Sequence, residues 1–566
     1  MTTLIGLPAL SLRTTHRLCL TALAAFFLVA GLYAGGKTLR GTARDKHRGT
    51  PVASAAIQVY DRSGVLLAST TTNTLGQWQV NIPVVGIAET GDVPRSFSLE
   101  QNYPNPFNPS TKIPFTISRS GRARITVYNI LGQLLDAKEF DLRQGSYTID
   151  WTSKGSAGVL FYSIEMGGER LTRKMVQLDG GAMPGLTTLS VMGRSISWNL
   201  ASPSGIDSCR IVASSLIYEP DSATVAFVDS AQADFLLETV HDRAFVIDLH
   251  NDVMEVISGT NFTYQIADRH VVVRNGDPQT DIPRFRDGGV DAQILSIWID
   301  PTKYAPAYYA TSMKFLDTLK AQVARNANDV KLTTSADTVD ALTRQNKIAG
   351  IVVVEGGHSI EDNLDNLRAF YRAGVRVMTI TWNNSTSWAV SAKDASSGVA
   401  GGLNEFGKSV IRTMDSLGMI IDVSHVGPQT VTDIFATSKN PIIASHSGAA
   451  AVRNHYRNLT DAQIRTIAQR GGVIGVVFYP TFLVSSGTAR LENVIQHIDY
   501  IKNLVGIDYV ALGSDFDGIE TTPVGLEDVS KFPAITEALL QRGYSKQDVR
   551  KILGENFMRV FRAVCK

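Results

Sequence analysis

Six side chains that can bind a metal ion or move a proton follow short apolar runs in the second half of the chain. They are imidazoles and carboxylates, with no thiolate among them: His250, Asp252, Glu355, His425, His446 and Asp515. Such a set suits catalytic zinc or a similar divalent ion rather than a structural cysteine site. One ion would leave ligands unused, so we expect two ions about 3.5–4 Å apart that share a carboxylate.

The first two of these residues, His250 and Asp252, directly follow the apolar run 244–247 and its continuation. Side chains alternate in extended backbone, so both point the same way from the end of a strand. In a chain with 10 histidines, a lone His-x-Asp triplet is more often a core histidine beside a turn aspartate. The four further groups make the metal site the stronger interpretation.

Short apolar runs alternate with amphipathic segments from residue 240 onward, which predicts parallel strands with covering helices. The expected strands are 244–250, 291–298, 349–355, 375–381, 419–424, 441–445, 473–478 and 509–513. Helices are expected at 313–324, 404–417, 461–470 and 491–504, among others.

This alternation fits either an open, doubly wound sheet or a closed (β/α)8 TIM-like barrel. The six candidate residues fall at the C-terminal ends of the first, third, fifth, sixth and eighth expected strands. In β/α barrels, active-site groups come from the C-terminal ends of several strands. We therefore predict a (β/α)8 barrel over residues 240–566.

The first half of the chain shows the period-two alternation of antiparallel strands, separated by Gly, Asn, Asp and Ser. We predict a β-sandwich at 37–93, a second β domain at 94–180, and a β-rich segment with a linker at 181–239. We expect 200–237 to complete the first sandwich, with the second domain inserted in a loop, where insertion is best tolerated. The predicted fold class is thus multidomain, with N-terminal β-sandwich modules before the barrel.

The first 36 residues read as an export signal, because basic residues precede an apolar run at 18–34 that ends in small residues. A signal anchor that stays in the membrane is the alternative. Either one predicts a protein that is periplasmic, bound to the cell envelope or secreted. A formal net charge of +1 offers no basic field, so no nucleic-acid partner is expected.

Several motifs of the second half lie in the order Asp248-Leu249-His250-Asn251-Asp252, Val354-Glu355-Gly356-Gly357-His358-Ser359, Asp422-Val423-Ser424-His425, Ala444-Ser445-His446-Ser447, Arg457-Asn458-Leu459-Thr460-Asp461 and Gly513-Ser514-Asp515-Phe516-Asp517-Gly518. Together they resemble the membrane (renal) dipeptidase family, which are zinc peptidases within the amidohydrolase-like barrels. The resemblance extends over about 240–565.

This resemblance implies that two Zn2+ ions are bound. By position, His250 and Asp252 would bind one ion, His425 and His446 the other, and Glu355 would bridge both. Two cations beside one water lower its pKa, which makes hydroxide available near neutral pH.

The resemblance also implies roles for residues around the ions. Asp515 matches the family acid that holds the water and passes its proton to the leaving amine. Arg457 matches the arginine that binds the terminal carboxylate of the substrate, a task suited to a guanidinium. Tyr479, at the end of the seventh expected strand, is a further substrate-binding candidate.

One position departs from the family. Where the mammalian enzymes have a histidine at the end of the fourth strand, thought to polarise the scissile carbonyl, this chain has Thr381-Trp382-Asn383-Asn384. Trp382 can donate an indole N–H, and an asparagine can donate an amide N–H. We expect Trp382 and Asn383 to contact the substrate.

The first half carries two other resemblances. The order Gly41-Thr42-Ala43-Arg44-Asp45 and, later, Gln77-Trp78-Gln79-Val80 is similar to the carboxypeptidase regulatory-like domain. Residues 94–178, with Val127-Tyr128-Asn129-Ile130-Leu131-Gly132-Gln133, resemble the immunoglobulin-like sorting domain of type IX secretion. That domain normally ends a chain, so a relic or a spacer is an alternative to a sorting role here.

These observations predict an exported binuclear zinc dipeptidase that uses metal-activated hydroxide. Two alternatives stay open. The same site could hydrolyse another small amide, such as an N-acyl amino acid, or the barrel could be a non-catalytic relic that acts as a binding module. The presence of every expected ligand and of Asp515 favours an active enzyme.

Overall fold

The computed structural model describes most of the chain after residue 36. The described residues are 37–62, 64–82, 97–103, 105, 107, 110–130, 132–142, 145–152, 158–177, 185–191, 208–259, 266 and 278–566. The predicted export signal or anchor lies outside them. None of the helices among the described residues has the length and apolar character needed to span a membrane. The chain divides into two compact units, of which the second holds Ala43–Ala55, Ala213–Asp221 and Phe235–Lys566.

Two four-stranded sheets combine strands from both sides of the middle β domain. One contains β1 (Lys37–Asp45), β4 (Gln77–Ile82), β15 (Ala231–Gln232) and β16 (Phe235–Leu237), and the other contains β14 (Asp221–Ala226), β13 (Ser208–Ser214), β2 (Ala56–Tyr60) and β3 (Leu66–Thr71). Alternate residues of β1 and β4 are buried, which is why their sequences alternate. We propose from this pairing that 208–237 complete the first sandwich.

The middle domain consists of two antiparallel sheets. Their strands, in sheet order, are β11 (Glu169–Gln177), β10 (Gly158–Met166), β7 (Gly121–Asn129) and β8 (Leu134–Leu142), and then β12 (Gly185–Val191), β9 (Gly145–Thr152), β6 (Ser110–Ile117) and β5 (Ser98–Leu99). Phe107, Phe115, Trp151 and Tyr162 are buried in its core. The strand-rich character predicted for the first half is therefore confirmed.

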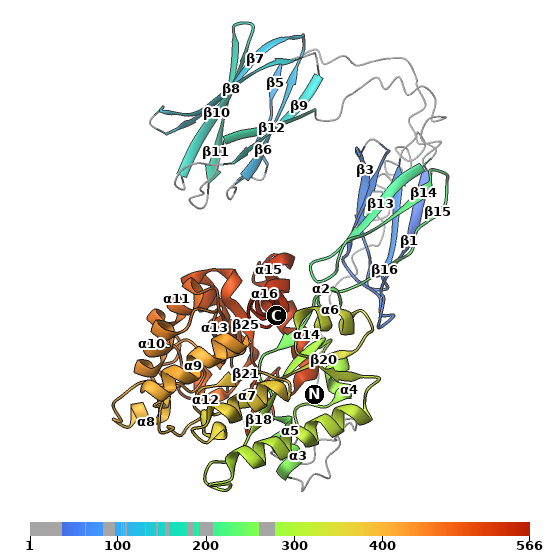
Figure 1. The fold of residues 1–566 in the computed structure, drawn as a ribbon. Helices are drawn as coiled ribbons and strands as arrows, with labels where there is room; N and C mark the ends of the chain where they lie inside the picture. The colour runs from blue at the N-terminus through green and yellow to red at the C-terminus, as the bar shows by residue number, and fades with distance from the viewer. Residues whose placement is uncertain are drawn as a thin grey trace, which may run out of the picture. The chain divides into compact units, whose positions relative to one another are not determined.

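The second half forms a nearly closed parallel barrel, as predicted (Figure 1). Its strands in order are β17 (Ile247–Asp248), β18 (Ala292–Trp298), β20 (Ile348–Glu355), β21 (Val375–Thr379), β22 (Ile420–Asp422), β23 (Ile443–Ser447), β24 (Val473–Val476) and β25 (Val510–Leu512). The backbone N–H of Leu249 donates to the carbonyl of Leu512 at 3.0 Å, which joins the last strand to the first. An open doubly wound sheet is thereby excluded.

Helices surround the barrel strands in the ribbon (Figure 1). They are α2 (Val240–Arg243), α3 (Val253–Gly259), α4 (Ile282–Asp287), α5 (Tyr308–Arg325), α6 (Ala336–Thr343), α7 (Leu364–Arg372), α8 (Ala392–Ser396), α9 (Glu405–Leu417), α10 (Pro428–Thr437), α11 (Asp461–Gln469), α12 (Pro480–Leu483), α13 (Leu491–Val505), α14 (Phe532–Gln541), α15 (Lys546–Arg550) and α16 (Asn556–Val564). Thr460 and Gln463 form a capping box at the start of α11, and Gly418, at φ 74°, ends α9.

The interior of the barrel is apolar below the site. Ile351 and Val353 of β20 pack in one buried cluster with Phe557 and Phe561 of α16. Because side chains alternate along a strand, Glu355 lies on the same inward face as these two residues. The strand therefore delivers one carboxylate at the C-terminal end of a filled barrel.

One strand was missed by the sequence analysis. β19 (Val330–Leu332) pairs with β20 outside the eight-strand order. It is three residues long with Lys331 at its centre, too short a run to show either a strand or a helix period.

Candidate active site

The first strand end brings His250 and Asp252 into a buried cluster. The Nε2 atom of His250 lies 3.3 Å from Asp252 Oδ2, 3.4 Å from Glu355 Oε2 and 4.0 Å from Asp515 Oδ1. The backbone N–H of Asp252 donates to Phe516 O, and that of Asp515 donates to His250 O. The ends of β17 and β25 thus run side by side, which is how residues far apart in sequence meet.

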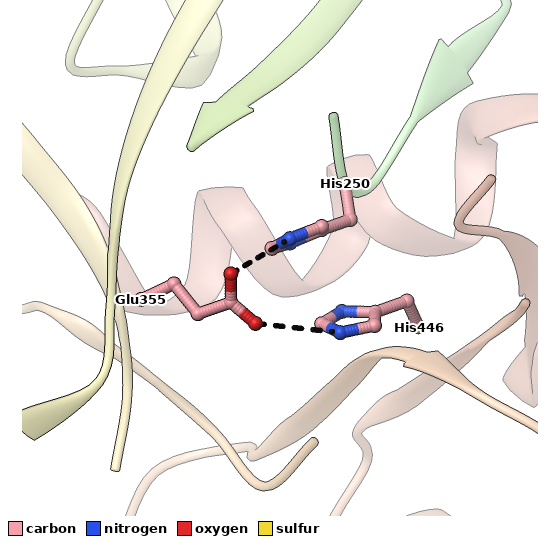
Figure 2. Close-up of side chains that lie close together, drawn as sticks. All are labelled: His250, Glu355 and His446. Carbon is pink, nitrogen blue, oxygen red and sulfur yellow. Dashed lines mark ion pairs between the residues drawn. The ribbon is translucent and has the colours of Figure 1, made fainter. Parts of the chain in front are cut away.

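Glu355 lies between His250 on one side and the pair His425 and His446 on the other. One carboxylate oxygen, Oε2, faces His250, and the other, Oε1, lies 3.1 Å from His425 Nε2 and 3.6 Å from His446 Nε2. Figure 2 shows this carboxylate pointing at His250 and His446 with different oxygens. Such an arrangement suits a carboxylate shared by two cations.

The two remaining histidines approach each other closely. The Nε2 atoms of His425 and His446 are 3.1 Å apart. Two neutral imidazoles that meet through unprotonated nitrogens repel unless a proton or a cation lies between or beside them. The geometry therefore fits ligands that converge on a common ion.

Ligand atoms also gather in two overlapping triads, His250–Glu355–His446 and His250–Asp252–Asp515. Within the part of the chain that the structure describes, both ring nitrogens of His250 and Oδ1 of Asp252 are buried without a hydrogen bond. Buried polar atoms are nearly always partnered, so these orphaned atoms need a ligand. The donor set, imidazole and carboxylate, fits divalent metal ions.

Burial and neighbouring charges set the protonation of the cluster. Burial lowers the pKa of His425 to about 4, and burial also holds the pKa of His446 well below its usual value. Both rings are therefore neutral, the form in which imidazole binds a metal. Although burial opposes it, the positive charge of the neighbouring His250 holds the pKa of Glu355 well below its usual value.

Asp515 differs from Glu355. Burial raises the pKa of the Asp515 carboxyl well above its usual value; His250 opposes this, while Asp252 and Glu355 add to it. Its side chain is 13% exposed, whereas that of His250 is fully buried. Asp515 therefore touches both the ligand cluster and the space outside it, where a proton can be exchanged.

Two of the site residues have left-handed backbone. His425 and Asp515 both have φ 66°, a region that non-glycine residues rarely adopt. Such conformations collect at functional sites because they aim a side chain at a cost in local energy. His and Asp adopt this region more often than most residue types, but residue type alone does not indicate which of them will do so.

Arg457 is buried beside the cluster. Its Nη1 donates to Ser447 Oγ at 3.4 Å and its Nη2 to His446 O at 3.2 Å, and the guanidinium lies 5.3 Å above the ring of Phe482. Its Nε has no hydrogen bond among the described residues, and no carboxylate there lies within ion-pair distance. Burial lowers the pKa of Arg457. A buried cation without an anionic partner is costly, which makes this position suited to an anionic ligand.

Tyr479 lies at the start of α12 and packs edge-on against Phe482, with ring centroids 4.8 Å apart. Burial raises the pKa of Tyr479, a hydrogen bond with Thr481 opposes this, and the carboxylate of Glu520 adds to it. The tyrosine is thus on the same side of the barrel end as Arg457, through their shared neighbour Phe482.

The fourth strand end carries Trp382 and Asn383, which behave differently. The amide oxygen of Asn383 lies 3.1 Å from Nδ1 of His425. We now propose that Asn383 orients this histidine, in addition to the substrate contact predicted for it. The ring of Trp382 lies 6.2 Å from that of His425 and 5.0 Å from that of Trp298.

Trp298 was missed by the sequence analysis. It ends β18, directly opposite Glu355 in the β18–β20 register, and its indole Nε1 is buried without a hydrogen bond among the described residues. The signal that could have identified it is an aromatic residue at the end of a predicted barrel strand.

A cavity of about 240 Å3 adjoins the site, and both His425 and Arg457 line it.

Comparisons with known proteins identify two regions of this chain. Residues 236–566 match the sequence model of the membrane dipeptidases, peptidase family M19. Residues 101–177 match that of the secretion system C-terminal sorting domain. Mouse dipeptidase 3 is 34% identical over 323 residues, which are 56% of this chain and 64% of the mouse protein. The chain thus spans less than two thirds of that relative.

Solved structures give the same fold. Dipeptidase AC, a metallopeptidase of family M19, is 26% identical with a TM-score of 0.51, over 57% of this chain and 99% of that one. A metallopeptidase from Rhodobacter sphaeroides, solved with a phosphinate mimic of L-Ala-D-Ala, is 24% identical with a TM-score of 0.52, over 57% and 99%. Because the family match covers more than half of the sequence and includes every site residue named above, the chain belongs to the membrane dipeptidase family, peptidase family M19.

Proposed function

We propose that the protein is an exported metallo-dipeptidase that hydrolyses dipeptides with the help of two zinc ions. The observation that carries this proposal is the position of Glu355, whose two oxygens face different histidines. His250 and Asp252 would hold one ion, His425 and His446 the other, and Glu355 both. When bound, two such ions supply Lewis acidity that lowers the pKa of a water and polarises the scissile carbonyl.

Asp515 is the proposed general acid and base. Its carboxyl lies beside His250 and is partly exposed, so it can reach both the nucleophilic water and a substrate nitrogen. It would accept the proton that the water loses and deliver it to the leaving amine. Carboxylates perform this transfer when their pKa is shifted towards the working pH, and burial shifts that of Asp515 upward.

Arg457 is the proposed anchor for the free carboxylate of the substrate. The guanidinium is buried and lacks an anionic partner among the described residues, so a carboxylate would complete its hydrogen bonding. The bond that is cleaved would then lie one residue from this anchor, which restricts hydrolysis to very short peptides. Tyr479 is the proposed second contact on this side.

Trp298 and Trp382 are proposed to bound the opposite side. The two indoles lie next to Glu355 and His425, so the substrate group that meets them must tolerate an apolar wall. We propose that this wall favours dipeptides with an apolar or aromatic side chain there.

The same wall favours one second candidate function. An acyl group is apolar and carries no charge, so Trp298 and Trp382 would accept it as readily as an amino-acid side chain. Arg457 would bind the carboxylate of an N-acyl amino acid as it would that of a dipeptide. Hydrolysis of N-acyl amino acids is therefore the alternative that the site supports.

A library of dipeptides and N-acyl amino acids, offered to the purified zinc-loaded chain, separates the two. We expect dipeptide hydrolysis that a chelator abolishes and added zinc restores. Turnover of acylated amino acids alone would replace the proposal with the alternative. Zinc binding without turnover of either class would contradict both and point to a binding module.

Location outside the cytoplasm is part of the proposal. The match of 101–177 to a secretion sorting domain suggests export, and the first 36 residues carry the predicted signal. Fractionation of the source cells should find the protein in the periplasm, the envelope or the medium. Recovery in the cytoplasm alone would contradict this.

A further inference from the structure

A buried carboxylate that is not among the metal ligands connects three strand ends beneath the site. Asp422, at the end of β22, accepts hydrogen bonds from Thr379 Oγ1 at 2.7 Å, Ser424 N at 3.0 Å, Ser445 N at 2.8 Å and Ser445 Oγ at 2.6 Å. It is fully buried. Four hydrogen-bond donors satisfy its two oxygens without a cation, so the orientation of this side chain is fixed.

Ser445 links this carboxylate to a metal ligand. Its hydroxyl oxygen lies 2.6 Å from Asp422 Oδ2 and 2.8 Å from Nδ1 of His446. A hydroxyl has one hydrogen to donate, and the carboxylate takes it. The serine oxygen can then only accept from His446, so Nδ1 of that ring carries the proton and Nε2 keeps its lone pair for a ligand.

His425, the other histidine of this pair, has the same tautomer as His446. Asn383 Oδ1 lies 3.1 Å from Nδ1 of His425 and can only accept, which again leaves Nε2 unprotonated. His250 is different, because among the described residues its Nδ1 has no hydrogen-bond partner. Neighbouring side chains therefore fix the tautomers of His425 and His446, which share one proposed ion position, but not that of His250 at the other position.

A second buried aspartate provides an internal comparison. Asp248 accepts from Ser514 N at 2.7 Å, Ser514 Oγ at 2.6 Å and Gln293 Nε2 at 3.1 Å. Ser514 Oγ reaches the backbone oxygen of His250 at 3.2 Å, and among the described residues it contacts no imidazole nitrogen. Asp248 therefore joins strand ends as Asp422 does, without setting the tautomer of a ring.

We propose that Asp422 and Ser445 are positioning residues that prepare His446 as a ligand through its Nε2, so that the ion held by His425 and His446 depends on them and the ion held by His250 and Asp252 does not. This inference rests on the proposed two-ion site. It predicts that the two ions can be lost separately.

Ser445→Ala tests the proposal by zinc titration against a chelating indicator. Outer partners of metal-bound histidines contribute roughly 10–100-fold to metal affinity, and we expect that loss for one ion only. Thr379→Val is the matched control: it removes one hydrogen bond to the same Asp422 oxygen but does not touch His446, and both affinities should stay close to those of the unchanged chain. Ser445→Thr keeps the hydroxyl, so the zinc affinity that Ser445→Ala loses should return in this variant.

The tautomer is read directly from 15N spectra of the histidine rings in the zinc-free chain. The unchanged protein should show His446 protonated at Nδ1, and Ser445→Ala should give a mixture of tautomers. Equal weakening of both ions by Ser445→Ala, an effect of Thr379→Val as large as that of Ser445→Ala, or an Nε2-protonated His446 would each overturn the proposal. If the unchanged chain bound no zinc, the proposed two-ion function would fail, while these ring spectra would still decide the inference.

Discussion

At the scale of single residues, the site divides into the proposed ligands, which must be unprotonated, and the proposed proton carrier, the carboxyl of Asp515. His425 and His446 are neutral through burial, whereas Asp515 has a raised pKa and partial exposure. The position of these side chains at the C-terminal ends of barrel strands could be predicted from the sequence, and their role as metal ligands stays a prediction. The left-handed backbone of His425 and the outer partner of His446 could not, because both depend on contacts between strands that are distant in sequence.

Replacing Asp515 by Asn should abolish proton transfer while leaving the metal ligands intact. General acid–base groups typically contribute about 10^2–10^4-fold, and we expect kcat to fall by that factor at unchanged zinc content. Steady-state kinetics with metal analysis of the same sample measures both. Unchanged kcat would remove Asp515 from its assigned role.

Replacing Arg457 by Ala should weaken the binding of substrates with a free carboxylate. Hydrogen bonds to charged groups contribute about 1.5–3 kcal/mol, so KM should rise by roughly 10–100-fold. Arg453→Ala is the control, because this neighbouring arginine donates to the backbone carbonyls of Val484 and Asn454. An equal rise in KM for carboxyl-amidated substrates would contradict the anchor.

At the scale of elements, the regular strands and helices of the barrel could be predicted from the sequence, whereas its irregular parts could not. The eight barrel strands and helices α5, α9, α11 and α13 were predicted close to their observed positions, because long apolar periods are local signals. β19 and the wall formed by Trp298 and Trp382 were not predicted. β19 is a short run of mixed polarity, and the two tryptophans meet only because two strand ends lie side by side. Neither feature produces a hydrophobic period in the sequence.

His497 of α13 should make stability depend on pH. Its Nδ1 accepts from Ala449 N at 2.9 Å, and burial lowers the pKa of His497 to about 4. The unfolded chain therefore takes up the proton first as the pH falls. The neutral ring contributes up to about 3 kcal/mol to the free energy of unfolding. This contribution is complete above about pH 6.5 and is lost as the pH falls towards about 4.

His497→Gln keeps an acceptor for Ala449 N–H but cannot titrate in this range. Denaturant unfolding of the metal-free chain at a series of pH values should show a shallower decline between pH ~6.5 and ~4 for the variant than for the unchanged chain. Identical slopes would show that this histidine is protonated in the folded state or contributes nothing.

Helix α16 should be needed for the stability of the barrel rather than for its chemistry. Phe557 and Phe561 stack at 5.7 Å and pack with the inward side chains of the strands. Phe557→Ala should lower the free energy of unfolding by about 3–5 kcal/mol. The zinc affinity of the folded fraction should stay unchanged. A variant that loses zinc but keeps its stability would contradict a purely stabilising role for α16.

At the scale of the whole molecule, the chain joins a barrel of the membrane dipeptidase family to β domains that are interleaved in sequence. β13 pairs with β2, and β15 and β16 pair with β1, across the middle domain. The alternating pattern after residue 200 suggested this completion, but strand pairing itself is a long-range contact that composition cannot specify.

This pairing predicts that 37–82 expressed alone does not fold, because β1 and β2 lose their partner strands. Joining 37–82 to 208–237 by a short flexible linker in place of the middle domain should give a folded sandwich. Hydrogen exchange and thermal unfolding of the two fragments decide the question. A stably folded 37–82 fragment would contradict the shared sandwich.

Two zinc ions are proposed to act together at Glu355. Stepwise addition of zinc to the metal-free chain, with dipeptide hydrolysis measured at each step, tests this most directly. We predict little activity until the second ion binds and a maximum near two equivalents of zinc. Full activity at one equivalent, with no further change on adding a second, would contradict the claim.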